Sequence, residues 1–421
     1  MPSLKTFDCI VVGGGPAGSM AAYTLAGNGI SVAILEAKDP STASVSKVCG
    51  GGLQLKAVRI LPFDVKEVVE REVFGMVFQR GLRERFTRRC SLPISYTVNR
   101  ARFDGLLLRH ARGVGAKLFH GEKALSLEPA TGRTGITRVF TGGDVFEARV
   151  VVGADGAHSM VKKVLKDPGG TALVQLGLIC EVEKERSNAQ IPEDLFIIDW
   201  GSVPGGYAWI FPKETTLPVG AMVPRELAGI LRPYLHKFLE KEGLKIPEDG
   251  RLSAQPIPTR RTGERIAASG GVLVGDAAGL VDPFTGEGLY YALRSGQIAA
   301  CHIQKYLAGG GDSLLDYERE IDVGLMQEII VAGKMRSFFN TFSRYIHNLY
   351  RRNDRLWYAF CEVMRGDRTL EELRRVRTRP PEPIQRYLEK FTAWYEARQI
   401  SRFNGSPMYK FLVSEGNSLK S

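Results

Sequence analysis

The feature that most constrains the fold is a strand–turn–helix–strand pattern at the N-terminus. The apolar run FDCIVVGG at residues 7–14 is typical of a buried parallel strand. PAGSMAAYTLAGNG at 16–29 predicts a helix, because proline stands in its first turn and glycine follows its end. ISVAILE at 30–36 predicts a second buried strand, so the chain is expected to begin with an α/β unit.

Three glycines occupy the turn between the first strand and the helix. Gly13, Gly15 and Gly18 form GxGxxG, and Glu36 ends the second strand. In this setting the glycines permit a tight turn and the close approach of a pyrophosphate, while the acidic residue binds a ribose hydroxyl. The pattern predicts a dinucleotide site, with a purely structural glycine turn as the alternative. It does not by itself separate NAD from FAD.

Two later glycine-rich segments favour FAD. GADG at 153–156 and GDAAG at 275–279 each follow an apolar run, and Asp276 is placed to accept a hydrogen bond from a ribityl hydroxyl. The helix predicted after TGEGL at 285–289 would point its positive end at an isoalloxazine ring. Such spacing suits a long cofactor that lies across the whole domain.

The remaining sequence predicts two further parts. From about 170 to 250, alternating, aromatic and proline-punctuated segments indicate an antiparallel sheet. Apolar residues from Met335 to Leu349 recur at three- and four-residue steps, which is typical of amphipathic helix. The predicted class is α/β (α+β): a Rossmann-like FAD-binding domain with an inserted antiparallel-sheet substrate domain and a C-terminal helical region. The predicted boundaries are 1–55, 96–168 and 252–325 for the FAD-binding domain, 56–95 and 169–251 for the substrate-binding domain, and 326–421 for the helices.

Cysteine spacing, apolar stretches and net charge exclude several classes of protein. The six cysteines have no CxxC or metal-ligand spacing, which argues against zinc, iron–sulfur clusters and a disulfide framework. No stretch approaches the roughly 18 to 20 apolar residues of a membrane span, so a cytoplasmic or membrane-surface location is expected. The net charge of +11 suggests an acidic partner, but charge alone does not choose among nucleic acid, anionic lipid and phosphorylated substrate.

Several motifs together resemble a known family. The chain resembles the FAD-dependent geranylgeranyl reductases, within the aromatic-hydroxylase-like flavoprotein superfamily. The matching motifs are GGGPAGSMAA with Glu36, KVCGGGL at 47–53, RARFD at 100–104, GADGAHS, GYAWIFPK at 206–213, and GDAAGLVDPFTGEGLYYALRSG. The likeness to this particular family rests mainly on CGG and YxWxFP.

This resemblance implies a set of cofactor contacts. It implies FAD contacts beyond the three glycines from Ala17, Glu36, Cys49, Gly50, Gly52, Arg100, Ala124, Asp276, Gly288 and Leu289. Ala124 is expected in the strand that follows GAKLF.

The YxWxFP motif predicts an aromatic wall. Tyr207, Trp209 and Phe211 are spaced by two, so on a strand they share one face. Such a wall suits an apolar chain threaded past a flavin, and the resemblance implies a lipid tunnel at this place. An ordinary aromatic sheet face packed in a core is the alternative.

Cys49 is the candidate catalytic residue. Reduction of an isolated double bond needs a hydride and a proton, and a thiol beside the flavin is a candidate proton donor. Lys47 could supply the electropositive setting that a reactive cysteine needs. The alternative is a small buried thiol that packs beside the flavin.

The expected function is that of an FAD-dependent oxidoreductase acting on CH–CH groups, which reduces C=C bonds of geranylgeranyl or polyprenyl chains on a lipid, diphosphate or quinone. The alternatives are a flavin monooxygenase or halogenase acting on an aromatic substrate, and a membrane-docked electron-transfer flavoprotein. The electron donor is expected to be NAD(P)H or a ferredoxin. The expected partners are an isoprenoid lipid and an anionic membrane surface, at which the protein is peripheral, and not nucleic acid.

Overall fold

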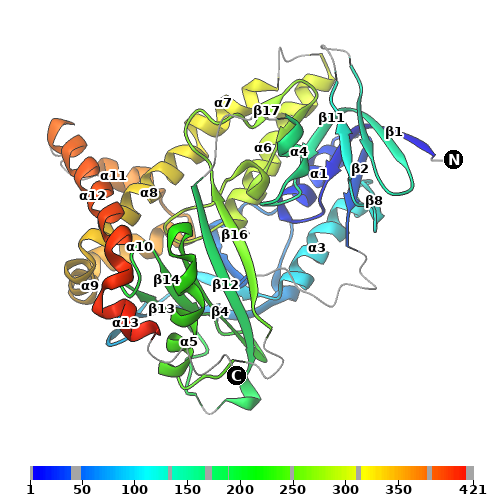
Figure 1. Ribbon diagram of the computed structural model, residues 1–421. Helices are drawn as coiled ribbons and strands as arrows, with labels where there is room; N and C mark the ends of the chain where they lie inside the picture. Colours follow the sequence, from blue (N-terminus) through cyan, green and yellow to red (C-terminus); the bar gives the residue numbers. More distant parts are fainter. Residues whose placement is uncertain are drawn as a thin grey trace.

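The computed structural model describes residues 3–38, 49–130, 135–165, 173–187, 189–246, 251–309, 314–376 and 382–413. Two large sheets lie towards opposite ends of the molecule, and the C-terminal helices run along one side (Figure 1). The predicted α/β class, with a Rossmann-like part, a second sheet and a helical C-terminal region, is confirmed.

The first sheet has eight strands and contains the N-terminal α/β unit. Its main path is β17-β18-β11-β1-β2-β8, and β10 pairs with both β11 and β9. The pairs along β18-β11-β1-β2-β8 are parallel, because helices cross between these strands. The bounds are β1 Leu4–Val12, β2 Val32–Glu36, β8 Lys117–His120, β9 Ser126–Glu128, β10 Thr137–Phe140, β11 Val145–Gly153, β17 Ala267–Ala268 and β18 Gly271–Leu273.

Helices cover this sheet and pack closely on one another. Gly296 on α6 makes the contact with α1 possible, because a Cβ there would lie 2.4 Å from the carbonyl oxygen of Ala17. The strands β1, β2 and β11 and the inner faces of α1 and α6 form one apolar core. The helices of this part are α1 Pro16–Gly27, α3 Arg100–Gly113, α4 Met160–Leu165, α6 Leu289–Leu307 and α7 Leu315–Val323, with the 3₁₀ turn η4 Gly275–Ala278.

The second sheet has seven strands in the order β16-β12-β15-β14-β13-β5-β6. Its strands pair antiparallel as predicted, except that β13 and β5 are parallel. The sequence did not reveal this, because strand direction depends on where two distant segments meet. The bounds are β5 Gly75–Arg80, β6 Glu84–Arg89, β12 Leu173–Glu183, β13 Leu195–Trp200, β14 Tyr207–Ile210, β15 Thr216–Pro224 and β16 Ser253–Thr259.

A helix and a small sheet complete the middle of the molecule. The helix α5 (Leu231–Lys241) buries Tyr234, Leu235 and Phe238 against the seven-stranded sheet. A three-stranded antiparallel sheet has the order β3-β7-β4, with bounds Gly52–Gln54, Ser95–Val98 and Val69–Val73, and α2 (Leu55–Arg59) follows β3. The remaining 3₁₀ turns are η1 Lys66–Val68, η2 Lys184–Arg186, η3 Arg225–Ile230 and η5 Phe403–Gly405.

The chain ends in a group of helices beside the second sheet (Figure 1). Their bounds are α8 Leu325–Thr341, α9 Ser343–Arg352, α10 Asp354–Arg365, α11 Leu370–Val376, α12 Glu382–Arg402 and α13 Pro407–Val413. Trp357 on α10 and Tyr350 on α9 pack against Phe78 of β5. Among the described residues, no helix combines the length and apolar character that crossing a membrane requires.

The strand pairing bears on one predicted boundary. The third segment of the FAD-binding domain was expected to begin at residue 252, yet β16 (Ser253–Thr259) pairs with β12 in the seven-stranded sheet. The chain therefore returns to the first sheet after Thr259. β16 carries two prolines, which cannot donate to a sheet ladder, so its sequence has little strand character. The other domain limits stay predictions.

Candidate active site

The GxGxxG turn has the geometry of a dinucleotide loop. Gly13 has a φ of +105°, and a Cβ there would lie 2.4 Å from the carbonyl oxygen of Ala154. A Cβ at Gly18 would lie 2.0 Å from the carbonyl oxygen of Gly13. A Cβ added at Gly15, by contrast, would have no described atom within 4 Å. The loop is therefore packed on its protein side and open at the N-terminus of α1, an arrangement typical of pyrophosphate-binding loops.

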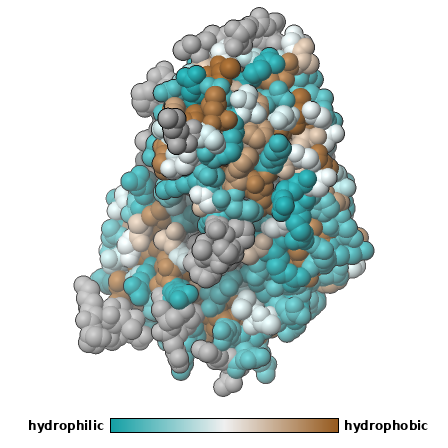
Figure 2. All heavy atoms as spheres, turned by 90° about the vertical axis from the view of Figure 1, so that its right-hand side faces the viewer, coloured by the Kyte–Doolittle hydropathy of each residue, from teal (hydrophilic) through white to brown (hydrophobic). Residues whose placement is uncertain are grey.

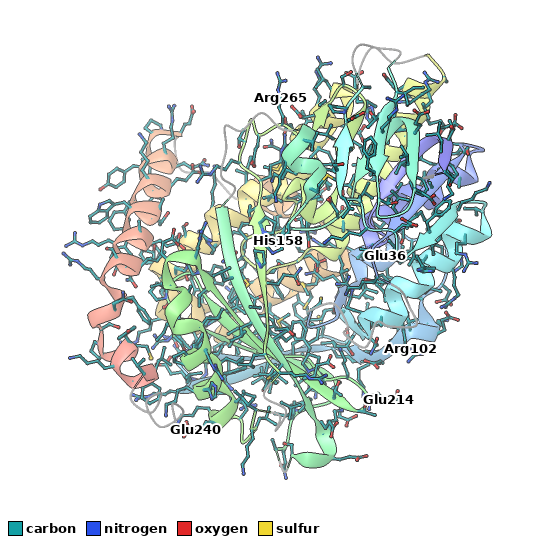
Figure 3. All side chains as sticks on the ribbon, turned by 45° about the vertical axis from the view of Figure 1, so that its right-hand side comes forward. Glu36, Arg102, His158, Glu214, Glu240 and Arg265 are labelled. Atoms are coloured by element: carbon teal, nitrogen blue, oxygen red, sulfur yellow. The ribbon has the colours of Figure 1, made fainter. Side chains whose placement is uncertain are left out.

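The other residues predicted for this half of the site lie near the loop or beside the sheet. Glu36 is at the end of β2 (Figure 3), and its carboxylate accepts hydrogen bonds from the backbone N–H groups of Gly14 (2.7 Å) and Lys38 (2.9 Å). Ala17 is buried on α1. Ala124 was expected in a strand, but it lies in the connection between β8 and β9, half-buried against the apolar core.

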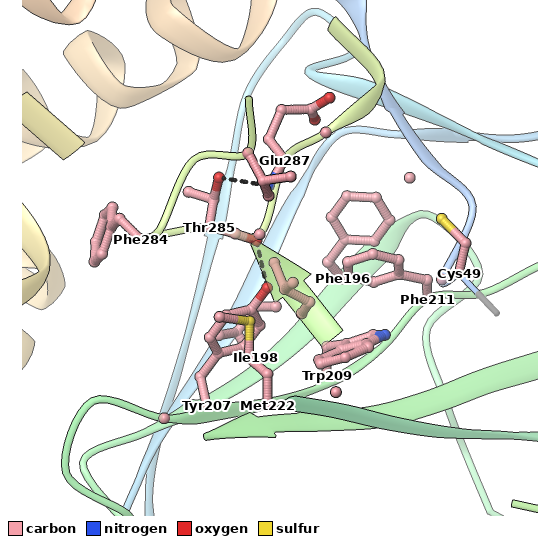
Figure 4. A pocket seen from close by; sticks show the side chains of 18 of the residues that line it. Cys49, Phe196, Ile198, Tyr207, Trp209, Phe211, Met222, Phe284, Thr285 and Glu287 are labelled. Carbon is pink, nitrogen blue, oxygen red and sulfur yellow. Dashed lines mark hydrogen bonds between the residues drawn. The ribbon is translucent and has the colours of Figure 1, made fainter. Parts of the chain in front are cut away.

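One cavity brings the remaining predicted residues together, between the seven-stranded sheet and the helices α6 and α8. Figure 4 shows part of it from close by. It is lined by Cys49, Gly50, Gly52, Arg100, Asp276, Gly288 and Leu289 of the predicted cofactor set and by all three aromatic residues of the predicted wall, Tyr207, Trp209 and Phe211. We call the first group the loop wall and the second the aromatic wall. Gly13, Gly15, Ala17, Gly18, Glu36 and Ala124 do not line this cavity.

The loop wall contains the predicted cysteine beside a buried cation. Arg100 is 3% exposed and is held by two hydrogen bonds of 2.9 Å to the carboxylate of Asp104. Burial lowers the pKa of Arg100, but Asp104 and the neighbouring Cys49 sulfur together raise it above its usual value. The electropositive neighbour of Cys49 is therefore Arg100; the expected one, Lys47, lies outside the described residues.

The glycines beside Cys49 make room for the aromatic wall. A Cβ at Gly50 would lie 2.6 Å from the ring of Phe211 and 2.9 Å from Nε1 of Trp209, and one at Gly52 would lie 3.0 Å from Phe211. Gly51 has a φ of +77° and donates its N–H to the Cys49 sulfur over 3.4 Å. The CGGG sequence thus allows the two walls to approach each other closely.

The aromatic wall has the alternation that its spacing predicts. Ring centroids lie 5.4 Å apart for Tyr207 and Trp209 and 6.3 Å apart for Trp209 and Phe211, so all three side chains share one face. Phe196 on β13 extends the wall, with its ring centroid 4.0 Å from that of Phe211. Trp209 is 8% exposed, and its Nε1–H has no hydrogen-bond partner among the described residues, so a buried donor remains in the cavity.

Polar groups gather where α6 begins. The hydroxyl of Tyr207 donates a hydrogen bond to the carbonyl oxygen of Thr285 (Figure 4). Burial raises the pKa of this phenol, so it stays protonated. Glu287 is 7% exposed, and burial raises the pKa of its carboxyl group against the opposing charge of Lys56. This end of the cavity therefore holds a phenol and a carboxyl group whose pKa values are both raised by burial.

Comparisons with known proteins place the chain in a family. Residues 6–186 match the FAD binding domain family. A digeranylgeranylglycerophospholipid reductase of Thermoplasma volcanium is 30% identical over 319 residues, which cover 70% of this chain and 78% of the relative. The chain belongs to the geranylgeranyl reductase family.

Solved structures agree at the level of the fold. A geranylgeranyl bacteriochlorophyll reductase-like protein of Thermoplasma acidophilum superimposes with a TM-score of 0.72 at 21% identity, covering 88% of this chain and 99% of the other. A flavin-dependent brominase superimposes with a TM-score of 0.66 at 18% identity, covering 86% and 94%. The scaffold is therefore shared by flavoproteins of different activity. As a geranylgeranyl reductase-like protein, the chain is an FAD-dependent oxidoreductase.

Sequence reasoning missed several residues that line the cavity of this geranylgeranyl reductase-like protein. The cavity is also lined by Phe196, Ile198, Met222, Phe284, Glu287, Arg336 and Phe339. Glu287 stands inside the recognised TGEGL segment, so its position was a usable signal. Arg336 and Phe339 come from α8, and nothing local in an amphipathic helix indicates which face meets a distant cavity.

Proposed function

We propose that this protein uses FAD to reduce C=C bonds of isoprenoid chains, of the geranylgeranyl or polyprenyl type, attached to a lipid, diphosphate or quinone group. The observation that carries the proposal is the single cavity in which the loop wall faces the aromatic wall. Membership of the geranylgeranyl reductase family supports the same substrate class.

We assign two groups of residues to the cofactor. Gly13, Gly15, Gly18 and the N-terminus of α1 would hold the pyrophosphate, with Ala17, Glu36 and Ala124 around the adenosine half. The loop wall, from Cys49, Gly50 and Gly52 to Arg100, Asp276, Gly288 and Leu289, would hold the flavin half. When bound, reduced FAD supplies a hydride for the alkene.

The aromatic wall would bind the isoprenoid chain. The rings of Tyr207, Trp209 and Phe211 line the cavity, and burial of an apolar chain against them is favourable without any directional contact. Side chains of the seven-stranded sheet, α6 and α8 line this space and would limit the access of water to the double bond.

Cys49 is the proposed proton donor. Its thiol lines the cavity, and the Arg100 guanidinium beside it would stabilise the negative charge that remains after the proton is given up. In the packing alternative, the thiol only fills space beside the flavin. Glu287, which lines the cavity and whose pKa burial raises, is the second candidate source of the proton.

Electrons are proposed to come from NAD(P)H or from a protein donor such as a ferredoxin. The protein is proposed to work in the cytoplasm at an anionic membrane surface, where isoprenoid lipids reside.

An anaerobic experiment tests the proposed function. The purified protein is loaded with FAD, reduced with dithionite and mixed with geranylgeranyl compounds. The expected result is reoxidation of the flavin together with a product mass gain of two hydrogens per reduced bond. Hydroxylation or halogenation of an aromatic compound, seen only after oxygen is admitted, would instead support the monooxygenase alternative.

A further inference from the structure

The helix α12 exposes a row of large apolar side chains. The exposed fractions are 51% for Ile384, 68% for Tyr387, 40% for Leu388 and 53% for Trp394. These positions, with the half-buried Phe391, recur at steps of three and four, so they share one face of the helix. By contrast, the face of the molecule that carries β8 and α3 mixes apolar residues among hydrophilic ones (Figure 2).

The opposite face of α12 is fixed to the protein. The buried carboxylate of Glu396 accepts hydrogen bonds from the Ser337 hydroxyl (2.5 Å) and the Asn340 amide (2.8 Å), both on α8. Glu389 pairs with Lys334 of α8 at 2.9 Å. These contacts hold the helix so that its apolar row stays directed outwards, and side chains of α12 project into solvent at the edge of the molecule (Figure 3).

Charge on α12 is sorted by face. Two of its acidic residues, Glu389 and Glu396, point towards α8, whereas Lys390, Arg398 and Arg402 are exposed. The Arg398 guanidinium lies 5.1 Å from the centre of the Trp394 ring. Aromatic residues with an amphipathic ring, accompanied by cations, suit the boundary between lipid headgroups and acyl chains.

We propose that the outward face of α12, formed by Ile384, Tyr387, Leu388, Phe391 and Trp394, binds the surface of an anionic lipid bilayer. The apolar row enters the headgroup region, and the exposed cations attract anionic headgroups.

The outward face of α12 lies close to the cavity, so membrane binding there would bring lipid substrates near the site. This step rests on the proposed function. Arg336 and Asn340, the α8 partners of Glu396, also line the cavity, as does Phe339. Glu396 of α12 thus lies directly behind residues that line the cavity. A bilayer on α12 would therefore hold membrane lipids beside the site in which their isoprenoid chains are reduced.

Vesicle flotation of the full-length, FAD-loaded protein tests the proposal. The wild-type protein is expected to float with vesicles of phosphatidylcholine and phosphatidylglycerol, less with phosphatidylcholine alone, and less in high salt. The triple variant Tyr387→Ser, Leu388→Ser, Trp394→Ser should bind about tenfold more weakly or worse, because most of the inserted apolar area is gone. The matched control Leu92→Ser, Leu125→Ser, Ile136→Ser removes side chains of similar exposure elsewhere and should float like the wild type.

Separate readouts keep the outcomes distinct. Equal flotation of the α12 variant and the wild type, or no flotation of the wild type, would overturn the proposal. A second result would also overturn it: the wild type sediments as a dimer without vesicles and the α12 variant as a monomer. The outward face of α12 would then bind a second copy of the chain. Reduction of geranylgeranyl diphosphate in vesicle-free buffer should be the same in all three proteins. If none of them reduces this diphosphate or geranylgeranyl chains on a lipid or a quinone, the proposed function fails while the vesicle result still stands.

Discussion

The loop wall and the aromatic wall face each other across the same cavity but are constructed differently. The loop wall is formed largely by backbone, with Gly50, Gly52 and Gly288, and by the buried Arg100, which pairs with the part-buried Asp104. The aromatic wall is formed by side chains, from Tyr207 and Trp209 on β14 and from Phe211, which directly follows it. The comparison suggests that the protein fixes one side of its site tightly and leaves the other side adjustable to the shape of an apolar ligand. Substitutions that affect only one wall test this difference.

The largest effect is expected in the glycine loop that adjoins the loop wall. In Gly18→Ala the new Cβ would lie 2.0 Å from a backbone carbonyl, so the turn must move and bound FAD should be lost. The measurement is the flavin-to-protein absorbance ratio after gel filtration, together with the melting temperature. The control is Gly27→Ala at the end of α1, where no described atom lies within 4 Å of the new Cβ. Full FAD occupancy in Gly18→Ala would contradict the assignment of this loop to the cofactor.

Removing the Cys49 thiol from the loop wall should impair alkene reduction without impairing FAD binding. Cys49→Ala is expected to retain FAD and to lose alkene reduction by roughly 100-fold, since a positioned general acid contributes on that order. Turnover of a geranylgeranyl substrate and the flavin spectrum are measured side by side. Cys301→Ala, which removes an exposed thiol, is the control. Near-normal turnover by Cys49→Ala would leave the cysteine only a packing role.

A methyl group can also be placed between the two walls. Gly50→Ala would push a Cβ to 2.6 Å from the Phe211 ring, so the aromatic wall must shift. Because that wall is adjustable, we expect about tenfold lower turnover with FAD retained, in line with the cost of misplacing groups near a reacting bond. Loss of FAD as severe as in Gly18→Ala would indicate that the two walls respond as one unit.

The smallest effect is expected for His347, which should make the free energy of unfolding depend on pH. His347 on α9 accepts a hydrogen bond from Nε1 of Trp200 over 3.0 Å, and burial lowers the pKa of His347 to about 4. A histidine whose pKa is lower in the folded state gives full stability above its unfolded pKa and loses it as the pH falls towards the folded value. Between pH 7 and 5 the free energy of unfolding should fall by roughly 1 kcal/mol more in the wild type than in His347→Gln. Identical pH profiles of melting temperature for the two proteins would refute this role.

The parts of the site encoded by short continuous segments were the most predictable. The N-terminal strand–helix–strand unit, the GxGxxG turn and the aromatic wall each follow from a local pattern, in which neighbouring residues in sequence decide the geometry. The parallel pairing of β5 with β13 and the contribution of α8 to the cavity depend on long-range contacts that leave no local pattern. The glycines beside Cys49 are an intermediate case. Their presence pointed to a close approach, but only the structure identifies Phe211 and Trp209 as the groups that approach.

The parallel pair β5–β13 has a consequence for how the protein can be assembled. It joins residues 75–80 to 195–200, and the intervening chain supplies β8–β11 of the other large sheet. The first sheet in turn gains β18 only at residues 271–273. Neither sheet is therefore complete until more than half of the chain has been synthesised, and no continuous fragment contains either one alone. With so many non-local contacts, folding should be slow and concerted, and attempts to express one part as an independent unit should yield insoluble protein.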